Sequence, residues 1–227
     1  MPDLLLYSFL QFLIEADTRL FLQLNAFHST FWDSFMYLYS SKEVWVPMYL
    51  TIVYMIFRNF SLRTSLICII ACIIVIVLAD QITASLIRPL VGRIRPGNTQ
   101  SPIYHFVHVV NNYRGGKFSF PSAHASNSFG LAFFVIFLFR KNLLSGVIAF
   151  WAIVNCYSRI YLGVHYFGDL FCGMFIGMFI AWGMYSVIRR HVKSEYRGYI
   201  RAYRLPPMVW AATIMALLIY SFVKVYL

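Results

Sequence analysis

The chain has 227 residues, of which 60% are hydrophobic, 19% are aromatic and only 12% are charged, and its formal net charge is +11. Soluble domains carry about 25% charged residues, so this composition excludes an ordinary soluble protein. We expect one integral membrane domain over residues 1–227, with room for about five to seven spanning helices of about 20 residues each.

The apolar runs, taken in chain order, predict an all-α polytopic bundle of about six transmembrane helices. The N-terminal segment, residues 1–35, holds an apolar run too short to span, so we expect a helix over 3–30 that lies along the membrane surface. A long polar loop follows the second spanning helix. The spanning helices are expected at 36–57, 64–87, 122–140, 143–160, 168–188 and 207–226.

The distribution of cations predicts the orientation. When the motif arginines described below are set aside, ten cations lie on one face and six on the other. The positive-inside rule then places the basic segment 189–204 in the cytoplasm and the polar loop outside. We interpret this basic segment as an ordinary topogenic loop that touches anionic lipid, and not as a nucleic-acid site.

Three short segments at the ends of the apolar runs carry residues suited to phosphate chemistry. Arginine offers bidentate donors that match phosphate oxygens, although a lone interfacial arginine is usually only a membrane anchor. Because three arginines each belong to a segment, we favour phosphate binding. The segments are Arg88-x6-Arg95-Pro96, Pro121-Ser122-Ala123-His124 and Ser158-Arg159-x5-His165-x3-Asp169.

The second segment opens a predicted helix, where free backbone N–H groups and the helix dipole favour an anion. We expect Ser122 and the Ala123 amide to donate to phosphate oxygens. His124, one turn into the helix, is a candidate general acid for the leaving-group oxygen.

The third segment places His165 and Asp169 four residues apart, on one face of a helix entry. A carboxylate bonded to one imidazole nitrogen fixes the tautomer and leaves the other nitrogen free to attack phosphorus. In isolation, such a pair is more often structural. Gly163 and Gly168 flank the pair and allow close approach of a ligand.

Together, the three segments resemble the type 2 phosphatidic acid phosphatase family, which includes undecaprenyl pyrophosphatases, lipid A phosphatases and vanadium haloperoxidases. The family pattern is Lys-x6-Arg-Pro, Pro-Ser-Gly-His and Ser-Arg-x5-His-x3-Asp. This chain departs from it at Arg88, which replaces the lysine, and at Ala123, which replaces the glycine. The resemblance covers about residues 60–190.

The resemblance implies a phosphatase that needs no metal or cofactor, with its site at the extracytoplasmic face of a bacterial inner membrane. It implies that His165 attacks phosphorus, Asp169 orients it and His124 protonates the leaving group. The phosphate would be bound by Arg88, Arg95, Ser122, Ala123 and Arg159. The helix within residues 205–227 is an addition to the family core, so both termini are expected outside.

The substrate is expected to be a membrane lipid phosphate. Arg114 and Lys117 in the polar loop favour the bulky head group of lipid A. Undecaprenyl pyrophosphate, phosphatidylglycerophosphate and phosphatidic acid are the alternatives. A non-catalytic phosphate transporter would need ionisable residues along a path through the membrane, and only Asp80 qualifies.

A few polar residues remain undecided. Arg93 matches no required position, and Asp80 either pairs with a motif arginine or serves a structural ion pair. His105 and His108 in the polar loop have no Cys or acidic partners, so no metal site is expected there. The four cysteines, Cys68, Cys72, Cys156 and Cys172, fall within apolar runs and are interpreted as small buried hydrophobes.

Overall fold

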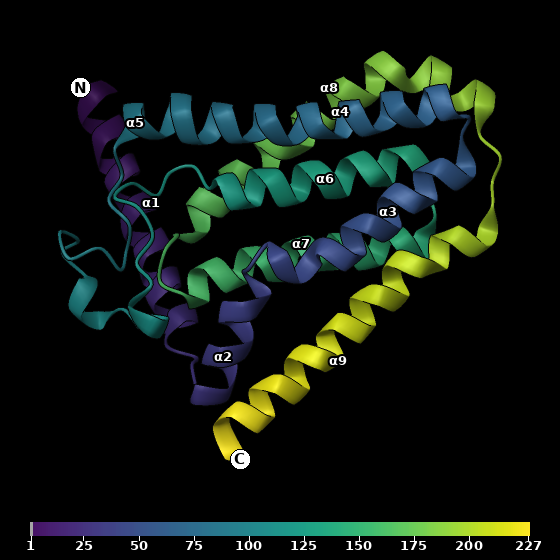
Figure 1. Ribbon diagram of the computed structural model, residues 1–227. Coiled ribbons are helices and arrows are strands. Elements are labelled where there is room, and N and C mark those ends of the chain that lie inside the picture. The colour runs from purple at the N-terminus through teal and green to yellow at the C-terminus, as the bar shows by residue number, and fades with distance from the viewer. Residues whose placement is uncertain (1) are drawn as a thin grey trace.

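The computed structural model describes residues 2–227, with side chains described outside 2–5, 195, 200 and 201. This part of the chain forms a bundle of helices with one isolated β-bridge, between Ile94 and Phe118 (Figure 1). The α-helices are α1 Pro2–Asn25, α2 Thr30–Tyr39, α3 Val46–Asn59, α4 Leu62–Asp80, α5 Arg88–Val91, α6 Ala123–Phe139, α7 Asn142–Tyr161, α8 Phe167–Glu195 and α9 Leu205–Tyr226.

Several of these helices are suited to cross a membrane. Among the described residues, four helical segments are long and apolar enough: Leu62–Val91, Asn142–Tyr161, Phe167–Ser194 and Ala202–Tyr226. Helix α6 is also apolar but has only 17 residues, which gives a length of about 26 Å at 1.5 Å per residue. The chain is therefore a multi-pass membrane protein, while the number of six spans stays a prediction.

The span expected at about 36–57, whose outer half Lys42 and Glu43 interrupt, is not one helix. The helix stops at Tyr39, and a new one begins at Val46 after the short 3₁₀ turn η1, Glu43–Trp45. Pro47 lies in the first turn of α3, where its missing N–H costs nothing. Within a continuous helix the same proline would remove a hydrogen bond and clash with the preceding turn. The indole of Trp45 donates to the Tyr39 carbonyl at 2.8 Å and closes the break.

Helices α6 and α8 pack backbone against backbone, because glycines line their contact. A Cβ added at Gly177 would lie 2.1 Å from the carbonyl oxygen of Ser126 and 2.8 Å from the nitrogen of Gly130. A Cβ at Gly173 would lie 2.4 Å from the Ser122 carbonyl oxygen. This close approach holds the first turn of α6 against the first turns of α8.

The second spanning segment changes its helical type near the polar loop. Between α4 and α5 lies the π-helical turn η2, Gln81–Ile87, and such turns shift the register of the residues that follow. The hydroxyl of Thr83 donates to the Ala79 carbonyl at 2.6 Å. Gly92, at φ +63°, then ends the helix in the left-handed conformation that favours glycine.

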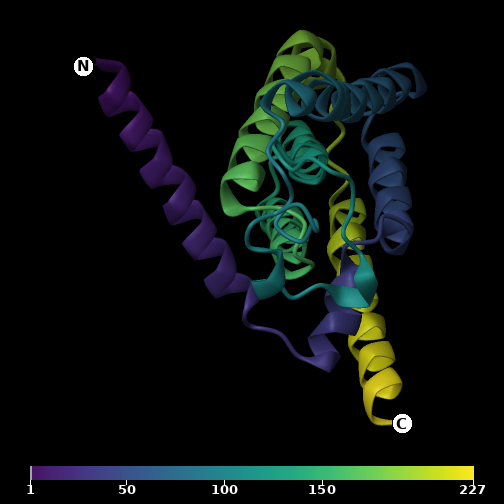
Figure 2. The same cartoon turned by 90° about the vertical axis from the view of Figure 1, so that its left-hand side faces the viewer.

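The two terminal helices differ in how they meet the bundle. Seen along the bundle, α1 leans away from it and approaches it only at its C-terminal end (Figure 2). Its outer half exposes apolar side chains, including Leu6, Phe9 and Phe12. Helix α9 runs from the far end of the bundle back towards the end that carries the polar loop (Figure 1).

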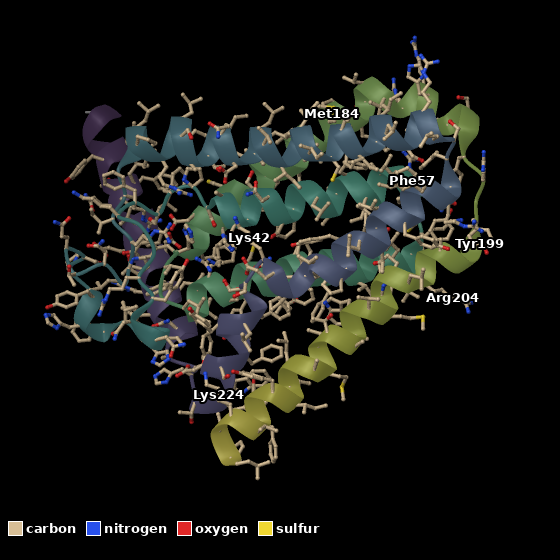
Figure 3. All side chains as sticks on the ribbon, in the orientation of Figure 1. Lys42, Phe57, Met184, Tyr199, Arg204 and Lys224 are labelled. Carbon is tan, nitrogen blue, oxygen red and sulfur yellow. The ribbon has the colours of Figure 1, made fainter. Side chains whose placement is uncertain are left out.

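The far end of the bundle is fixed by Asn59. Its amide donates to the Met55 carbonyl at 2.8 Å, and its side-chain oxygen accepts from the Tyr199 amide at 2.8 Å and the Tyr203 hydroxyl at 2.7 Å. Tyr199 and Arg204 mark this end in Figure 3. The basic segment 189–204 therefore lies at the opposite end of the bundle from the three motif segments.

Candidate active site

Arg88 and Arg95 approach the start of α6 from the preceding segment. The Arg88 Nη2 donates to the carbonyl of Pro121 at 3.0 Å, and the Arg95 Nε donates to the carbonyl of Phe118 at 3.0 Å. Arg95 is 7% exposed. Gly115, at φ +63°, lies beside it, and a Cβ there would come within 2.5 Å of the Arg95 Nη1. The backbone thus fits closely around this guanidinium.

Arg159, in the last turn of α7, is held by two hydroxyls from other segments. Its Nη1 donates to the Ser40 hydroxyl, and its Nη2 donates to the Tyr113 hydroxyl at 3.0 Å. The side chain is 3% exposed. Neither Ser40 nor Tyr113 belongs to a motif, so sequence reasoning missed both.

Each of the three guanidiniums keeps a buried N–H that has no partner among the described residues. These atoms are the Arg88 Nε, the Arg95 Nη1 and the Arg159 Nε. A buried cation with spare donors is costly unless an anion balances it. Burial and the charges of Arg159 and Arg88 lower the pKa of Arg95 to about 10, so it still carries its charge at neutral pH. The three cations therefore suit a dianionic phosphate group.

His165 and Asp169 come together as the spacing predicts. The His165 Nδ1 lies 3.4 Å from the Asp169 Oδ2, which is longer than a hydrogen bond but close enough to tighten when a substrate binds. The two side chains are 2% and 0% exposed. The Tyr166 amide donates to the same Oδ2 at 2.9 Å. The carboxylate is therefore fixed by the backbone beside the imidazole.

The electrostatic surroundings keep His165 neutral. Burial lowers its pKa well below the ordinary value, and the charges of Arg95, Arg159 and Arg88 lower it further. A neutral imidazole is the form that can act as a nucleophile.

The start of α6 lies beside this pair. Ser122 is the N-cap, and its Oγ accepts from the Ala125 amide at 3.4 Å. Its own amide donates to the Asp169 carbonyl at 3.0 Å, so that amide is already engaged, whereas the Ala123 amide lies in the first turn of α6, where backbone N–H groups have no partner within the helix. The His124 Nε2 lies 3.4 Å from the Ser40 carbonyl oxygen.

Backbone contacts between glycines join the first and third segments. The Gly97 amide donates to the Gly163 carbonyl at 2.8 Å, and a Cβ added to Gly97 would lie 2.8 Å from the same oxygen. Gly163 itself has φ +72°. A larger residue at either position would separate the loop of Arg95 from the loop of His165.

Arg93 and Asp17 also lie in this region. The sequence left the role of Arg93 undecided and gave no sign that Asp17 belongs to the site. The Arg93 Nη1 lies 2.7 Å from the Asp17 Oδ2 and 3.0 Å from the Asp169 Oδ1. Asp17 is in α1, so the N-terminal helix reaches the centre of the site.

Two expectations about other polar residues need correction or refinement. His108 does have an acidic partner, because its Nε2 lies 2.8 Å from the Asp33 Oδ1, which also accepts from the Tyr161 hydroxyl at 2.7 Å. Asp33 is 75 residues away in the sequence, which is why the pair could not be foreseen. Asp80 accepts from the Asn127 amide at 3.4 Å, and no ion pair to a motif arginine is found for it in the described part of the chain.

The described histidines, cysteines and carboxylates do not form a metal site. Within the described residues, no group of three or more His, Cys, Asp or Glu side chains could hold a metal ion. Cys68 is buried, and the other three cysteines are half-buried and unpaired with one another.

A cavity of about 420 Å³ opens beside His124. Its lining combines polar and apolar side chains, and its walls come from α3, α4, α6 and α7 and from the break before α3. Lys42, one of the lining residues, is labelled in Figure 3, next to the site ends of α6 and α7. The polar lining residues include Ser40, Lys42 and His124, and the apolar ones include Ile52, Ile56 and Ile76.

The fold and the site together define a multi-pass membrane enzyme that acts on phosphate groups. The PAP2 superfamily model matches residues 69–193, which is more than half of the chain. The chain belongs to the PAP2 superfamily, and it is a phosphate monoester hydrolase of that type.

Two relatives cover most of the chain. One, the "Lipid A 4'-phosphatase" of Bacteroides thetaiotaomicron, is 49% identical over 181 residues, which are 80% of this chain and 80% of that protein. Another, the "Lipid A 4'-phosphatase" of Porphyromonas gingivalis, is 32% identical over 191 residues, 83% of this chain and 79% of that protein.

Two crystal structures share the fold. The PAP2-type phosphatidylglycerolphosphate phosphatase of Bacillus subtilis has a TM-score of 0.59 at 17% identity, covering 78% of this chain and 87% of its own. LpxE of Aquifex aeolicus has a TM-score of 0.52 at 23% identity, covering 74% and 94%. At these identities the likeness concerns the fold.

Proposed function

We propose that this protein removes the 4'-phosphate of lipid A. The observation that carries this proposal is the 49% identity, over 80% of both chains, to a protein named lipid A 4'-phosphatase. The three arginines, each with a buried N–H that has no partner among the described residues, and the neutral histidine beside a carboxylate supply the chemistry that such an enzyme needs.

In the proposed reaction, Arg88, Arg95 and Arg159 bind the phosphate oxygens, with the Ser122 hydroxyl and the Ala123 amide as further donors. The three cations offset the charge that spreads over these oxygens in the transition state. They also orient the phosphorus towards His165.

The Nε2 of His165 attacks phosphorus and forms a P–N bond as the P–O bond to the lipid breaks. His124 gives its proton to the departing lipid oxygen, while Asp169 stabilises the developing imidazolium through Nδ1. A water molecule then attacks the phosphohistidine and gives a proton to His124. Inorganic phosphate leaves, and both histidines return to their starting state.

The cavity beside His124 supports a lipid as the leaving group. A general acid must lie within reach of the leaving oxygen, and His124, the candidate acid, lines this cavity. A cavity of this volume falls in the range of small-molecule sites. It can hold part of one acyl chain against its apolar lining while the head group stays beside Ser40, Lys42 and His124.

We further propose a bacterial inner membrane location, with the site facing the periplasm and residues 1–227 acting as one domain. The basic segment 189–204 lies at the other end of the bundle from the motifs, as the positive-inside rule requires for a cytoplasmic segment. Under this orientation α9 brings the C-terminus to the periplasmic side.

The test is phosphate release by detergent-purified protein with excess EDTA, over a panel of lipids. The panel contains lipid A, undecaprenyl pyrophosphate, phosphatidylglycerophosphate and phosphatidic acid, and mass spectrometry locates the phosphate lost from lipid A. We expect release of the 4'-phosphate, abolished by His165→Ala and by Arg159→Ala. His105→Ala and Arg63→Ala, both exposed positions outside the site, serve as matched controls.

Other outcomes have definite meanings. Preference for another lipid of the panel would keep the phosphatase and replace its substrate. Dependence on a divalent metal would contradict the phosphohistidine mechanism. No release from any lipid by folded protein would favour the non-catalytic phosphate transporter.

A further inference from the structure

Arg93 differs from the three phosphate-facing arginines in what it contacts. Its Nη1 lies between two carboxylates, 2.7 Å from the Asp17 Oδ2 and 3.0 Å from the Asp169 Oδ1. Its guanidinium carbon lies 3.8 Å from the ring centroid of Tyr166. The charge of Arg93 is thus committed to protein groups, whereas Arg88, Arg95 and Arg159 keep spare donors.

Asp17 is fixed on its other side by the start of α8. Its Oδ1 accepts from the Gly168 amide at 2.9 Å, where the dipole of α8 favours a negative charge. A Cβ at Gly168 would lie 2.8 Å from the Asp17 Oδ2, so only glycine lets the carboxylate approach this far. Asp17 is therefore a built part of the α8 entry.

The rest of the C-terminal half of α1 holds the same loop. Phe21, fully buried, meets the Tyr166 ring edge-on at 5.3 Å between centroids. The side-chain amide of Asn25 donates to the carbonyls of Ile160 and Tyr161 at 3.0 and 2.9 Å. Helix α1 thus contacts the segment 160–168 on both sides of His165.

We propose that Arg93 and Asp17 are positioning residues that act through Asp169. Arg93 binds the Oδ1 of Asp169, which leaves the Oδ2 for the imidazole of His165. Asp17 shares the charge of Arg93 and keeps its guanidinium from taking both oxygens of Asp169 in a bidentate pair, the geometry that arginine and carboxylate otherwise prefer. This inference rests on the proposed phosphohistidine chemistry.

The first test separates kcat from KM. We expect Arg93→Gln to lower kcat by about 10- to 100-fold, the effect of one charged hydrogen bond, with KM changed by less than about threefold because no phosphate contact is lost. Arg93→Lys keeps the charge and should recover part of the loss. Asp17→Asn should also lower kcat. Arg19→Gln, on the exposed face of α1 in a surface pair with Glu15, is the matched control.

The second test asks whether Arg93 acts through Asp169. In an Asp169→Asn background, Arg93→Gln should lower kcat by no more than about twofold further, since residues that act as one unit are not additive. A full additional loss, or a large rise in KM, would show that Arg93 binds phosphate directly and would overturn the proposal. Thermal unfolding of each variant identifies those that lose activity by unfolding.

Binding of orthovanadate, a phosphate-like anion, gives a readout independent of lipid turnover. We expect Arg93→Gln and Asp17→Asn to bind it within about threefold of wild type, and Arg159→Ala to lose most binding, because Arg159 is one of the three arginines that keep a buried N–H for the anion, whereas Arg93 binds carboxylates. Weakening of vanadate binding by Arg93→Gln as severe as by Arg159→Ala would contradict the positioning role. If wild type binds vanadate but hydrolyses no lipid tested, the proposed substrate is wrong, but vanadate binding by the variants still tests the role of Arg93 and Asp17.

Discussion

The guanidinium of Arg159 donates to the hydroxyl of Ser40, a residue 119 positions earlier in the chain. Ser40 lies in the break between α2 and η1, and its carbonyl oxygen also faces His124. Replacing Ser40 by alanine removes the hydroxyl and keeps the carbonyl. We expect kcat/KM to fall by about tenfold, at the low end of the effect of a hydrogen bond to a charged group.

The neighbouring hydroxyl provides a control for this prediction. Ser41 is half-buried, and its hydroxyl donates to the carbonyl of Tyr37 and not to Arg159, so Ser41→Ala should leave kcat/KM within about twofold of wild type. The prediction is tested by measuring kcat/KM of both variants for one lipid phosphate under steady-state conditions. Equal effects of the two changes would mean that Ser40 does not orient Arg159.

The sequence predicted the motif residues of the site because their chemistry is local. The pair His165 and Asp169 is four residues apart, and Ser122 precedes a helix whose first turn is polar. Both patterns fix side chains on one face without any knowledge of the rest of the fold. The structure places them as expected, although their catalytic roles stay proposals.

The partners of the site could not be predicted, because they come from distant segments. Asp17, Ser40 and Tyr113 reach the arginines from α1, from a helix break and from a loop. Nothing in their own neighbourhoods distinguishes them from surface polar residues. Lys42 and Glu43 interrupt the outer half of the apolar run 36–57, but this interruption alone did not show that the helix ends at Tyr39 and that a new one begins before Pro47.

Gly177 offers a test of the packing that sets the site. A Cβ there would lie 2.1 Å from the Ser126 carbonyl oxygen, and the backbone of α6 would have to move. We expect Gly177→Ala to lower the free energy of unfolding by about 1–3 kcal/mol, as overpacking does, and to lower activity because the first turn of α6 shifts with it. Thermal unfolding in detergent measures the first effect.

Gly183 is the matched control in the same helix. No heavy atom lies within 4 Å of a Cβ added there, so Gly183→Ala should stabilise α8 by up to about 1 kcal/mol. A destabilisation by Gly183→Ala as large as that by Gly177→Ala would mean that the close α6–α8 contact is not what makes Gly177→Ala destabilising.

The cavity predicts a dependence on acyl chain length. Val53 lines it from α3, and Val53→Trp should fill part of the space. We expect kcat/KM for a long-chain lipid phosphate to fall by about tenfold or more, since each buried methylene is worth about 0.8 kcal/mol. A short water-soluble phosphate monoester should be hydrolysed at the wild-type rate. Leu50→Trp, on the exposed face of the same helix, should change neither rate. An equal loss of activity on both substrates in Val53→Trp would mean that the acyl chain does not bind in this cavity.

The surroundings of His165 predict the pH dependence. Burial first, and then the charges of Arg95, Arg159 and Arg88, lower the pKa of this imidazole. The nucleophile must be unprotonated, so activity is present above its folded-state pKa and is lost as the pH falls through it. In wild type we therefore expect the acid limb of kcat/KM due to His165 below pH 6.5, the ordinary value for histidine.

Arg95→Gln separates this limb from the ionisation of the substrate. A phosphate monoester has its own second pKa near 6, but that pKa is common to every variant. Removing one cation beside His165 raises the pKa of the imidazole, so the acid limb should move towards higher pH in Arg95→Gln. His105→Ala should leave the limb in place. A limb that stays fixed in Arg95→Gln would mean that it reports the substrate or another group, and that the arginines bind phosphate without holding His165 neutral.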